Sequence, residues 1–95
     1  MIEIDVDNSR WNSGREAMQF VARHDGKRIN CYVSREALVD FASVRDDVEL
    51  AMAAFSDNKH LIADAVTGRI ERGEFDASGE VIIRLHDLER AGRKP

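Results

Sequence analysis

The segment from Met18 to Leu38, MQFVARHDGKRINCYVSREAL, constrains the fold more than any other part of this chain. Within it, the pair Asp25-Gly26 separates two stretches of β-type sequence. Asp-Gly is favoured in two-residue type I′ turns, because both central residues need a positive φ and glycine adopts it without strain. The segment therefore predicts a tight β-hairpin, with strands at about residues 15–23 and 27–34.

A two-residue loop also determines which residues face each other across the hairpin. If His24 lies opposite Lys27, strand alternation divides the side chains between two faces. One face carries only apolar residues and is predicted to be buried. The other face holds Val21 and Tyr32 among polar residues. A slip of one residue in the pairing would mix apolar and polar side chains on both faces. Pattern and turn chemistry thus agree on one register. The face predicted to be buried carries Met18, Phe20, Ala22, Ile29, Cys31 and Val33.

The segments around the hairpin predict two further strands and a short helix. Ile2, Ile4 and Val6 alternate with acidic residues as a short edge strand, and residues 7–14 have the composition of a loop that Trp11 anchors against the sheet. Ser34 is predicted to cap a helix over residues 35–42. Near the end of the chain, the alternation over residues 81–85 indicates a last strand.

A helical stripe of apolar residues runs from about Asp47 to Arg72, and Gly73 is a natural stop after it. The triplet Ser56-Asp57-Asn58 could begin a second helix, but the stripe keeps its phase if Lys59 contributes its aliphatic stem, so we favour one continuous helix. Residues 88–95 are charged and are expected to form a frayed tail. The fold class is α+β: a small, mostly antiparallel sheet of three or four strands, with a short helix and one long helix on one face.

Composition indicates one soluble domain over residues 1–95. A chain of 95 residues buries roughly 60–65% of its unfolded surface, which leaves room for one core. No apolar run approaches the ~18 residues of a membrane span, and the acidic N-terminus does not have the pattern of a secretion signal.

One cysteine cannot form an internal disulfide, which fits the cytoplasm. A net charge of -4 with both signs interspersed argues against nucleic acid as the main partner.

None of the residues that could carry catalysis stands in a recognisable motif. Cys31 is predicted to face the core, where a thiol is unreactive, and Ser34 is explained by capping. His24 flanks a turn, and His60 with Asp64 has helical spacing but no second histidine or cysteine ligand. His86 likewise has no second histidine or cysteine at a spacing typical of metal ligands. The glycines do not form a phosphate-binding loop, so we assign no catalytic, cofactor-binding or metal-binding residue.

Three function classes follow from these observations. The first is a non-catalytic interaction or regulatory module, which could form a homodimer through the outer sheet face or through an exposed part of the long helix. On the outer sheet face, the expected contact residues are the apolar trio Val21, Tyr32 and Ile82. The second is a nucleic-acid-associated protein, with a C-terminal basic tail and a hairpin patch. The third is a small-ligand protein or enzyme around Cys31 or His60. The residues proposed for the basic patch are Arg15, Arg23, Lys27 and Arg28.

Residues spread over nearly the whole chain resemble those of a known bacterial family. They include Trp11, Phe20, Gly26, Cys31, Val33-Ser34, Ala37-Leu38, Ala54-Phe55, Asn58, Ile62, Ala65, Gly73, Gly79, Val81 and Ile83. In these positions the chain resembles the small proteins grouped as domain of unknown function family 1488. The position after the helix asparagine, often arginine in that family, is Lys59 here. The resemblance implies one bacterial cytoplasmic domain and carries over no activity or catalytic residue.

Overall fold

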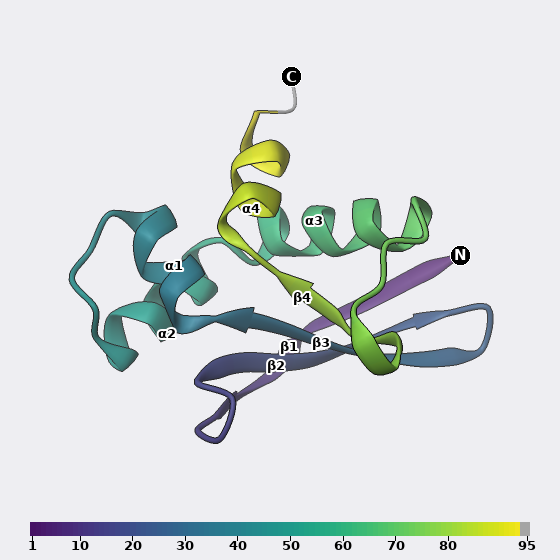
Figure 1. Cartoon of the computed structure of the whole chain (residues 1–95), viewed down its shortest axis with the longest axis horizontal. Helices are drawn as coiled ribbons and strands as arrows, with labels where there is room; N and C mark the ends of the chain where they lie inside the picture. The colour runs from purple at the N-terminus through teal and green to yellow at the C-terminus, as the bar shows by residue number, and fades with distance from the viewer. Residues whose placement is uncertain (94–95) are drawn as a thin grey trace.

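The computed structural model describes residues 1–93 and shows an α+β fold with one four-stranded sheet. The strands lie in the order β1-β2-β3-β4, antiparallel except for the parallel pair β3 and β4. Figure 1 shows α3 and α4 lying above the strands, with α1 and α2 together at one end. The elements are β1 (Ile2–Asn12), β2 (Ala17–His24), β3 (Lys27–Ser34), α1 (Arg35–Ala42), α2 (Val48–Asp57), α3 (Lys59–Glu71), the 3-10 turn η1 (Ala77–Gly79), β4 (Val81–Ile83) and α4 (Leu85–Gly92).

The predicted hairpin is confirmed, including its register. His24 pairs with Lys27, and each pair onward follows the predicted alignment up to Ala17 with Ser34. Asp25 and Gly26 have φ values of 52° and 78°, the two left-handed residues that a type I′ turn requires. The turn and the apolar pattern of the strands therefore predicted the alignment of β2 and β3.

The core lies between the inward face of this sheet and the helices. All six apolar residues that the register placed inward are buried, and one continuous cluster joins them to the helices. Phe20 of β2 and Phe55 of α2 are in direct contact, with ring centroids 5.6 Å apart. The sheet contributes every second residue to this cluster, as expected for a sheet covered on one face.

β1 is longer than predicted, because the segment we interpreted as a loop over residues 7–14 is strand as far as Asn12. The register of β1 against β2 shifts between Asp5 and Arg10, so the added residues form a bulge. The bulge is held by Asn8 Nδ2 donating to Asp5 Oδ2 at 2.9 Å and by Lys59 Nζ at 3.1 Å from Asp7 Oδ1. After the bulge Trp11 pairs with Met18 and packs against the core. Turn-like composition thus marked a bulge, not a loop.

The short helix begins where it was predicted. Ser34 Oγ accepts the backbone N–H of Ala37 at 3.1 Å, so Ser34 is the N-cap of α1. The helix ends at Ser43, which adopts the left-handed conformation with φ 57°. α1 therefore follows directly from β3, and the junction is held by the Ser34 cap and by the backbone N–H of Arg35 donating to the carbonyl of Glu16 at 2.9 Å.

The single long helix was the wrong choice, because α2 and α3 are separate helices divided at Asn58. Asn58 has non-helical backbone angles, and its Nδ2 donates to the carbonyl of Ala54 at 2.8 Å. A continuous helix over residues 47–72 would be about 39 Å long at 1.5 Å per residue, and the largest extent of the molecule is 38 Å. Breaking the helix lets both halves contact the same compact core.

The end of the chain also differs from the prediction. β4 is only Val81–Ile83, and Leu85 begins α4 instead of continuing the strand. Leu88 is fully buried, so residues 88–93 are not a frayed tail; residues 94–95 lie outside the described residues. The fold thus has four α-helices in residues 1–93 where two were predicted. None of the helices described is both long and apolar enough to cross a membrane.

Candidate functional site

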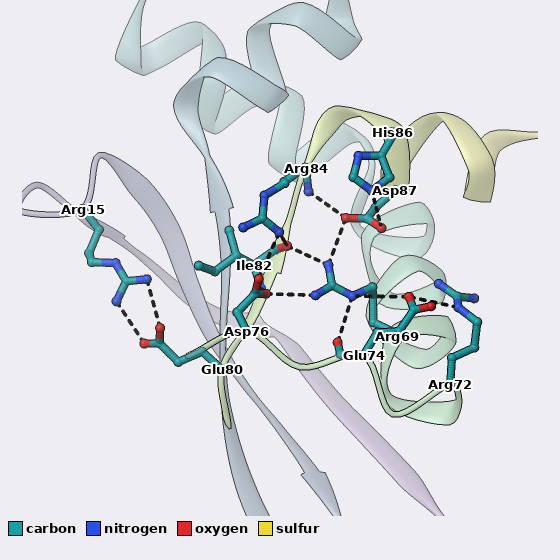
Figure 2. A network of polar contacts seen from close by, with 10 residues as sticks. All are labelled: Arg15, Arg69, Arg72, Glu74, Asp76, Glu80, Ile82, Arg84, His86 and Asp87. Carbon is teal, nitrogen blue, oxygen red and sulfur yellow. Dashed lines mark hydrogen bonds and ion pairs between the residues drawn. The ribbon is translucent and has the colours of Figure 1, made fainter. Parts of the chain in front are cut away.

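The most densely connected polar group is Arg69, which α3 points into the junction with β4 and α4 (Figure 2). Its side chain is 8% exposed. The guanidinium donates to two carboxylates: Nη2 to Asp76 at 2.9 Å and Nη1 to Asp87 at 3.2 Å. It also donates to two backbone carbonyls, from Nε to Glu74 at 2.9 Å and from Nη1 to Ile82 at 3.0 Å. Arg69 therefore joins three segments that the sequence separates.

Asp76 is the second centre of this network. Its Oδ2 accepts the backbone N–H of Ile82 at 2.7 Å, and its Oδ1 lies 3.1 Å from Arg84 Nη1. Partial burial by itself raises the pKa of Asp76, but the Ile82 N–H and the guanidinium groups of Arg84 and Arg69 outweigh it. The pKa of Asp76 is held below its ordinary value, and the carboxylate is charged near neutral pH.

Asp87 connects the network to α4. Its Oδ2 accepts the backbone N–H of Arg84 at 3.0 Å, which closes the first turn of the helix, and it also receives Arg69. His86 Nε2 lies 3.5 Å from Asp87 Oδ1 at the exposed rim. Within residues 1–93 every buried side-chain nitrogen and oxygen has a hydrogen-bond partner. The network is thus a structural clamp with its polar atoms committed to the fold.

This clamp seals one edge of the sheet. The N–H and C=O of Ile82, at the middle of β4, bond to Asp76 and Arg69, where a further strand would have to pair. A second donor, Arg84 Nη1, reaches the same carbonyl at 3.2 Å. Side chains therefore satisfy the backbone groups that edge strands usually leave exposed.

No binding or bridging role was assigned to Arg69 from the sequence, so the clamp was missed. One signal was available: Arg69 lies four residues after Ala65 and next to Ile70, both buried on the apolar face of α3. An arginine on a buried face needs acidic partners. Asp76 and Asp87 flank the last apolar strand, and they are the acids that the fold brings to Arg69.

The trio Val21, Tyr32 and Ile82 does share the open face of the sheet, where Tyr32 pairs with Ile82 across β3 and β4. Tyr32 is only 7% exposed, however, because the guanidinium carbon of Arg15 lies 3.9 Å from the ring centroid. Glu80 holds Arg15 in place with two contacts, at 2.9 and 3.3 Å. The central residue of the predicted interaction surface is thus covered by the ion pair between Arg15 and Glu80.

The predicted basic patch is divided between two ends of the molecule. Arg15 precedes β2 and pairs with Glu80, while Arg23, Lys27 and Arg28 lie at the opposite end of the hairpin, beside the Asp25-Gly26 turn. The predicted strand over residues 15–23 already implied this separation, and in the structure the eight residues of β2 lie between Arg15 and the turn. Two of its members, Lys27 and Arg28, border a hollow that is also lined by the exposed residue Phe75.

The other candidate residues do not gather into a site. Cys31 is fully buried and free, and burial raises the pKa of its thiol to about 12. His24 lies 3.4 Å from Asp25, and His60 and Asp64 are exposed on α3. In the described part of the chain, no group of three histidine, cysteine, aspartate or glutamate side chains is arranged to hold a metal ion.

Comparison with known proteins settles the family. The family model described as "Protein of unknown function (DUF1488)" matches residues 6–83. The chain belongs to the DUF1488 family. A crystal structure of a DUF1488 protein of unknown function from Shewanella loihica PV-4 is similar, with a TM-score of 0.77, 24% identity and coverage of 87% of this chain and 91% of that chain. No curated protein matches the chain. These findings establish a DUF1488 member with the fold of that structure.

Proposed function

We propose that this protein is a small non-catalytic interaction module that binds an extended segment of a partner protein along the edge of β1. The observation that carries the proposal is the contrast between the two edges of the sheet. β4 is three residues long and sealed by Arg69 and Asp76, whereas β1 is eleven residues long. In residues 1–93 no strand pairs with the outer edge of β1. A long strand with one free edge is a template for β-augmentation.

Charge supports a partner with basic residues. Glu3 and Asp5 lie on the open face of β1, opposite Arg23 and Val21, and have no ion-pair partner within 4 Å among the described residues. In an added strand, the Cβ atoms of the directly opposed residues would lie about 4.5–5.5 Å from the Cβ atoms of Glu3 and Asp5. Lysine or arginine at alternate positions would therefore complement β1.

The same charges disfavour self-association through this edge. A second copy pairing antiparallel over residues 2–6 would place Glu3 and Asp5 against their counterparts, and directly opposed like charges are destabilising. The alternative dimer through Val21, Tyr32 and Ile82 needs Arg15 to leave the ring of Tyr32. A different protein is therefore a better occupant than a second copy. We further propose a cytoplasmic location, which a single buried free thiol supports.

The test uses a defined peptide and backbone NMR. A seven-residue peptide alternating Lys and Thr is titrated into isotope-labelled protein, with a Glu/Thr peptide and a Pro-interrupted Lys peptide as probes that cannot bind in this way. We expect amide shifts and slowed hydrogen exchange confined to residues 2–6, lost in the Glu3→Lys, Asp5→Lys double variant. Glu89→Lys, an exposed charge reversal on α4, is the matched control.

Two results would contradict the proposal. Equal binding of the Lys and Glu peptides would remove the charge argument. A doubled mass in light scattering, with concentration-dependent protection of β1 amides, would show that a second copy occupies the edge.

A further inference from the structure

We infer that the hollow between the Asp25-Gly26 turn and Phe75 binds a nucleotide unit, with the base stacked on Phe75 and the phosphate held by Lys27 and Arg28. The hollow has a volume of about 510 Å³, within the range of small-molecule sites. It lies away from the β1 edge, so it is independent of the function proposed above. Its lining residues are His24, Asp25, Lys27, Arg28, Ile29, Phe75, Ser78 and Gly79.

Phe75 is exposed to solvent, although the residues on either side of it, Glu74 and Asp76, are held by hydrogen bonds. Arg69 binds the carbonyl of Glu74 on one side of it and the carboxylate of Asp76 on the other, both at 2.9 Å. Phe75 is 44% exposed. A buried arginine thus holds the segment in a conformation that presents an aromatic ring to solvent, where a ligand can stack on it without a further ordering cost.

The backbone a few residues after Phe75 forms a tight turn that also lines the hollow. Ser78 and Gly79 have φ values of 62° and 75°, two successive left-handed residues, of which the serine is the unfavourable one. They form part of the wall of the hollow, which residues of the hairpin turn also line. The wall is therefore a fixed turn, closed by the backbone N–H of Asp76 donating to the carbonyl of Glu80 at 2.7 Å.

The lining of the hollow from β3 carries two cations on consecutive residues, whose side chains leave the strand toward opposite faces. Lys27 and Arg28 are exposed, and neither has a carboxylate within 4 Å among residues 1–93. The acid in the lining, Asp25, lies 3.4 Å from His24 Nε2. Two uncommitted cations beside an exposed aromatic ring and the apolar side chain of Ile29 match a ligand that is planar at one end and anionic at the other. A nucleotide has this chemistry, whether free or as one unit of a single strand.

The small size of the positive patch limits the ligand to about one unit. The net charge of the chain is -4, and Arg15 lies at the other end of β2, so phosphates of a long strand or duplex would not find a continuous basic track. The site therefore takes a mononucleotide or an exposed nucleotide of single-stranded RNA or DNA.

The test is an NMR and calorimetric titration with AMP, UMP, an eight-residue oligouridylate and inorganic phosphate. We expect shifts at residues 24–29 and 75–79 for nucleotides, and weaker shifts for phosphate alone. Phe75→Ala should lower the affinity about 5- to 150-fold, the equivalent of one stacked base. The Lys27→Ala, Arg28→Ala double variant should reduce the salt dependence. Met52→Ala and Arg45→Ala are controls at exposed positions on other segments.

The results of these titrations distinguish a free nucleotide from a single strand as the ligand, and some of them would contradict the inference. Comparable binding of mononucleotide and oligonucleotide identifies a free nucleotide as ligand, and binding of the oligonucleotide alone identifies a single strand. Absence of shifts in this hollow, or an affinity unchanged by Phe75→Ala, overturns the inference. Preferential binding of an acidic phenylalanine peptide over both nucleotides also overturns it. None of these results depends on the peptide titration of β1.

Discussion

Nη1 of Arg69 lies 3.2 Å from Oδ2 of Asp87, and this contact joins α3 to α4 across a separation of 18 residues. Both side chains are almost completely buried, at 8% and 3% exposed. The pair, together with Asp76, ties the C-terminal third of the chain to the sheet.

Removing Arg69 should lower the stability of the fold far more than removing Arg72, the C-cap residue of the same helix. Arg69→Met leaves Asp87 buried without its cation, and we expect a loss of about 3–5 kcal/mol in the free energy of unfolding. Arg72→Met removes an exposed ion pair to Glu74 and should cost less than about 1 kcal/mol. Urea unfolding followed by circular dichroism gives both values. Equal losses would show that the clamp does not stabilise the fold.

Stability should fall in acid because of Asp76. Its folded-state pKa is lowered, so its stabilising contribution is complete above the ordinary aspartate value of about 4 and disappears as pH falls through the lower folded value. Urea midpoints between pH 7 and pH 2.5 should decline most steeply below pH 4, and less steeply in Asp76→Asn. Asp64→Asn, at an exposed position on α3, serves as the control. Parallel pH profiles for wild type and Asp76→Asn would exclude this role.

The C-terminal helix should be part of the cooperative unit. Leu88 is fully buried, so Leu88→Ala creates a cavity and should cost about 2–5 kcal/mol. Glu89→Ala, the exposed neighbour, should change stability by less than about 0.5 kcal/mol. Thermal unfolding of the two variants distinguishes them. A Leu88→Ala protein as stable as wild type would mean that α4 is not docked in solution.

Arg15 should protect Tyr32 from modification. With Arg15→Ala the ring loses the guanidinium that covers it, and its nitration by tetranitromethane should accelerate several-fold. Global stability should fall by no more than about 1 kcal/mol, because Arg15 is partly exposed. Mass spectrometry after timed exposure measures the rate, with Arg10→Ala as control. An unchanged rate would mean that Arg15 does not cover the ring in solution.

The thiol of Cys31 should be inert in the folded protein. Burial favours the neutral form and raises its pKa to about 12, so at pH 7 the reactive thiolate is scarce and the sulfur is inaccessible. Iodoacetamide labelling should be slow in native buffer and should accelerate in urea in step with unfolding. Complete labelling of the native protein within minutes would contradict the burial.

Interactions that are local in sequence were predictable from the residues. The Asp25-Gly26 turn, the register of β2 against β3 and the Ser34 cap all depend on neighbours within a few residues, and the structure confirms each. The inward position of Cys31 follows from the same register. Pleat and turn geometry suffice for these features because no distant segment competes with them.

Features set by distant contacts were not predictable in the same way. The apolar stripe over residues 47–72 kept its helical phase, but the compact core required a break at Asn58. The arginines show the same limit: a single sequence does not reveal which acids the fold brings to Arg69, or that Glu80 would place Arg15 over Tyr32. Backbone geometry and side-chain pattern therefore determine the hairpin, while packing and charge pairing between remote segments decide helix breaks, sealed edges and exposed sites.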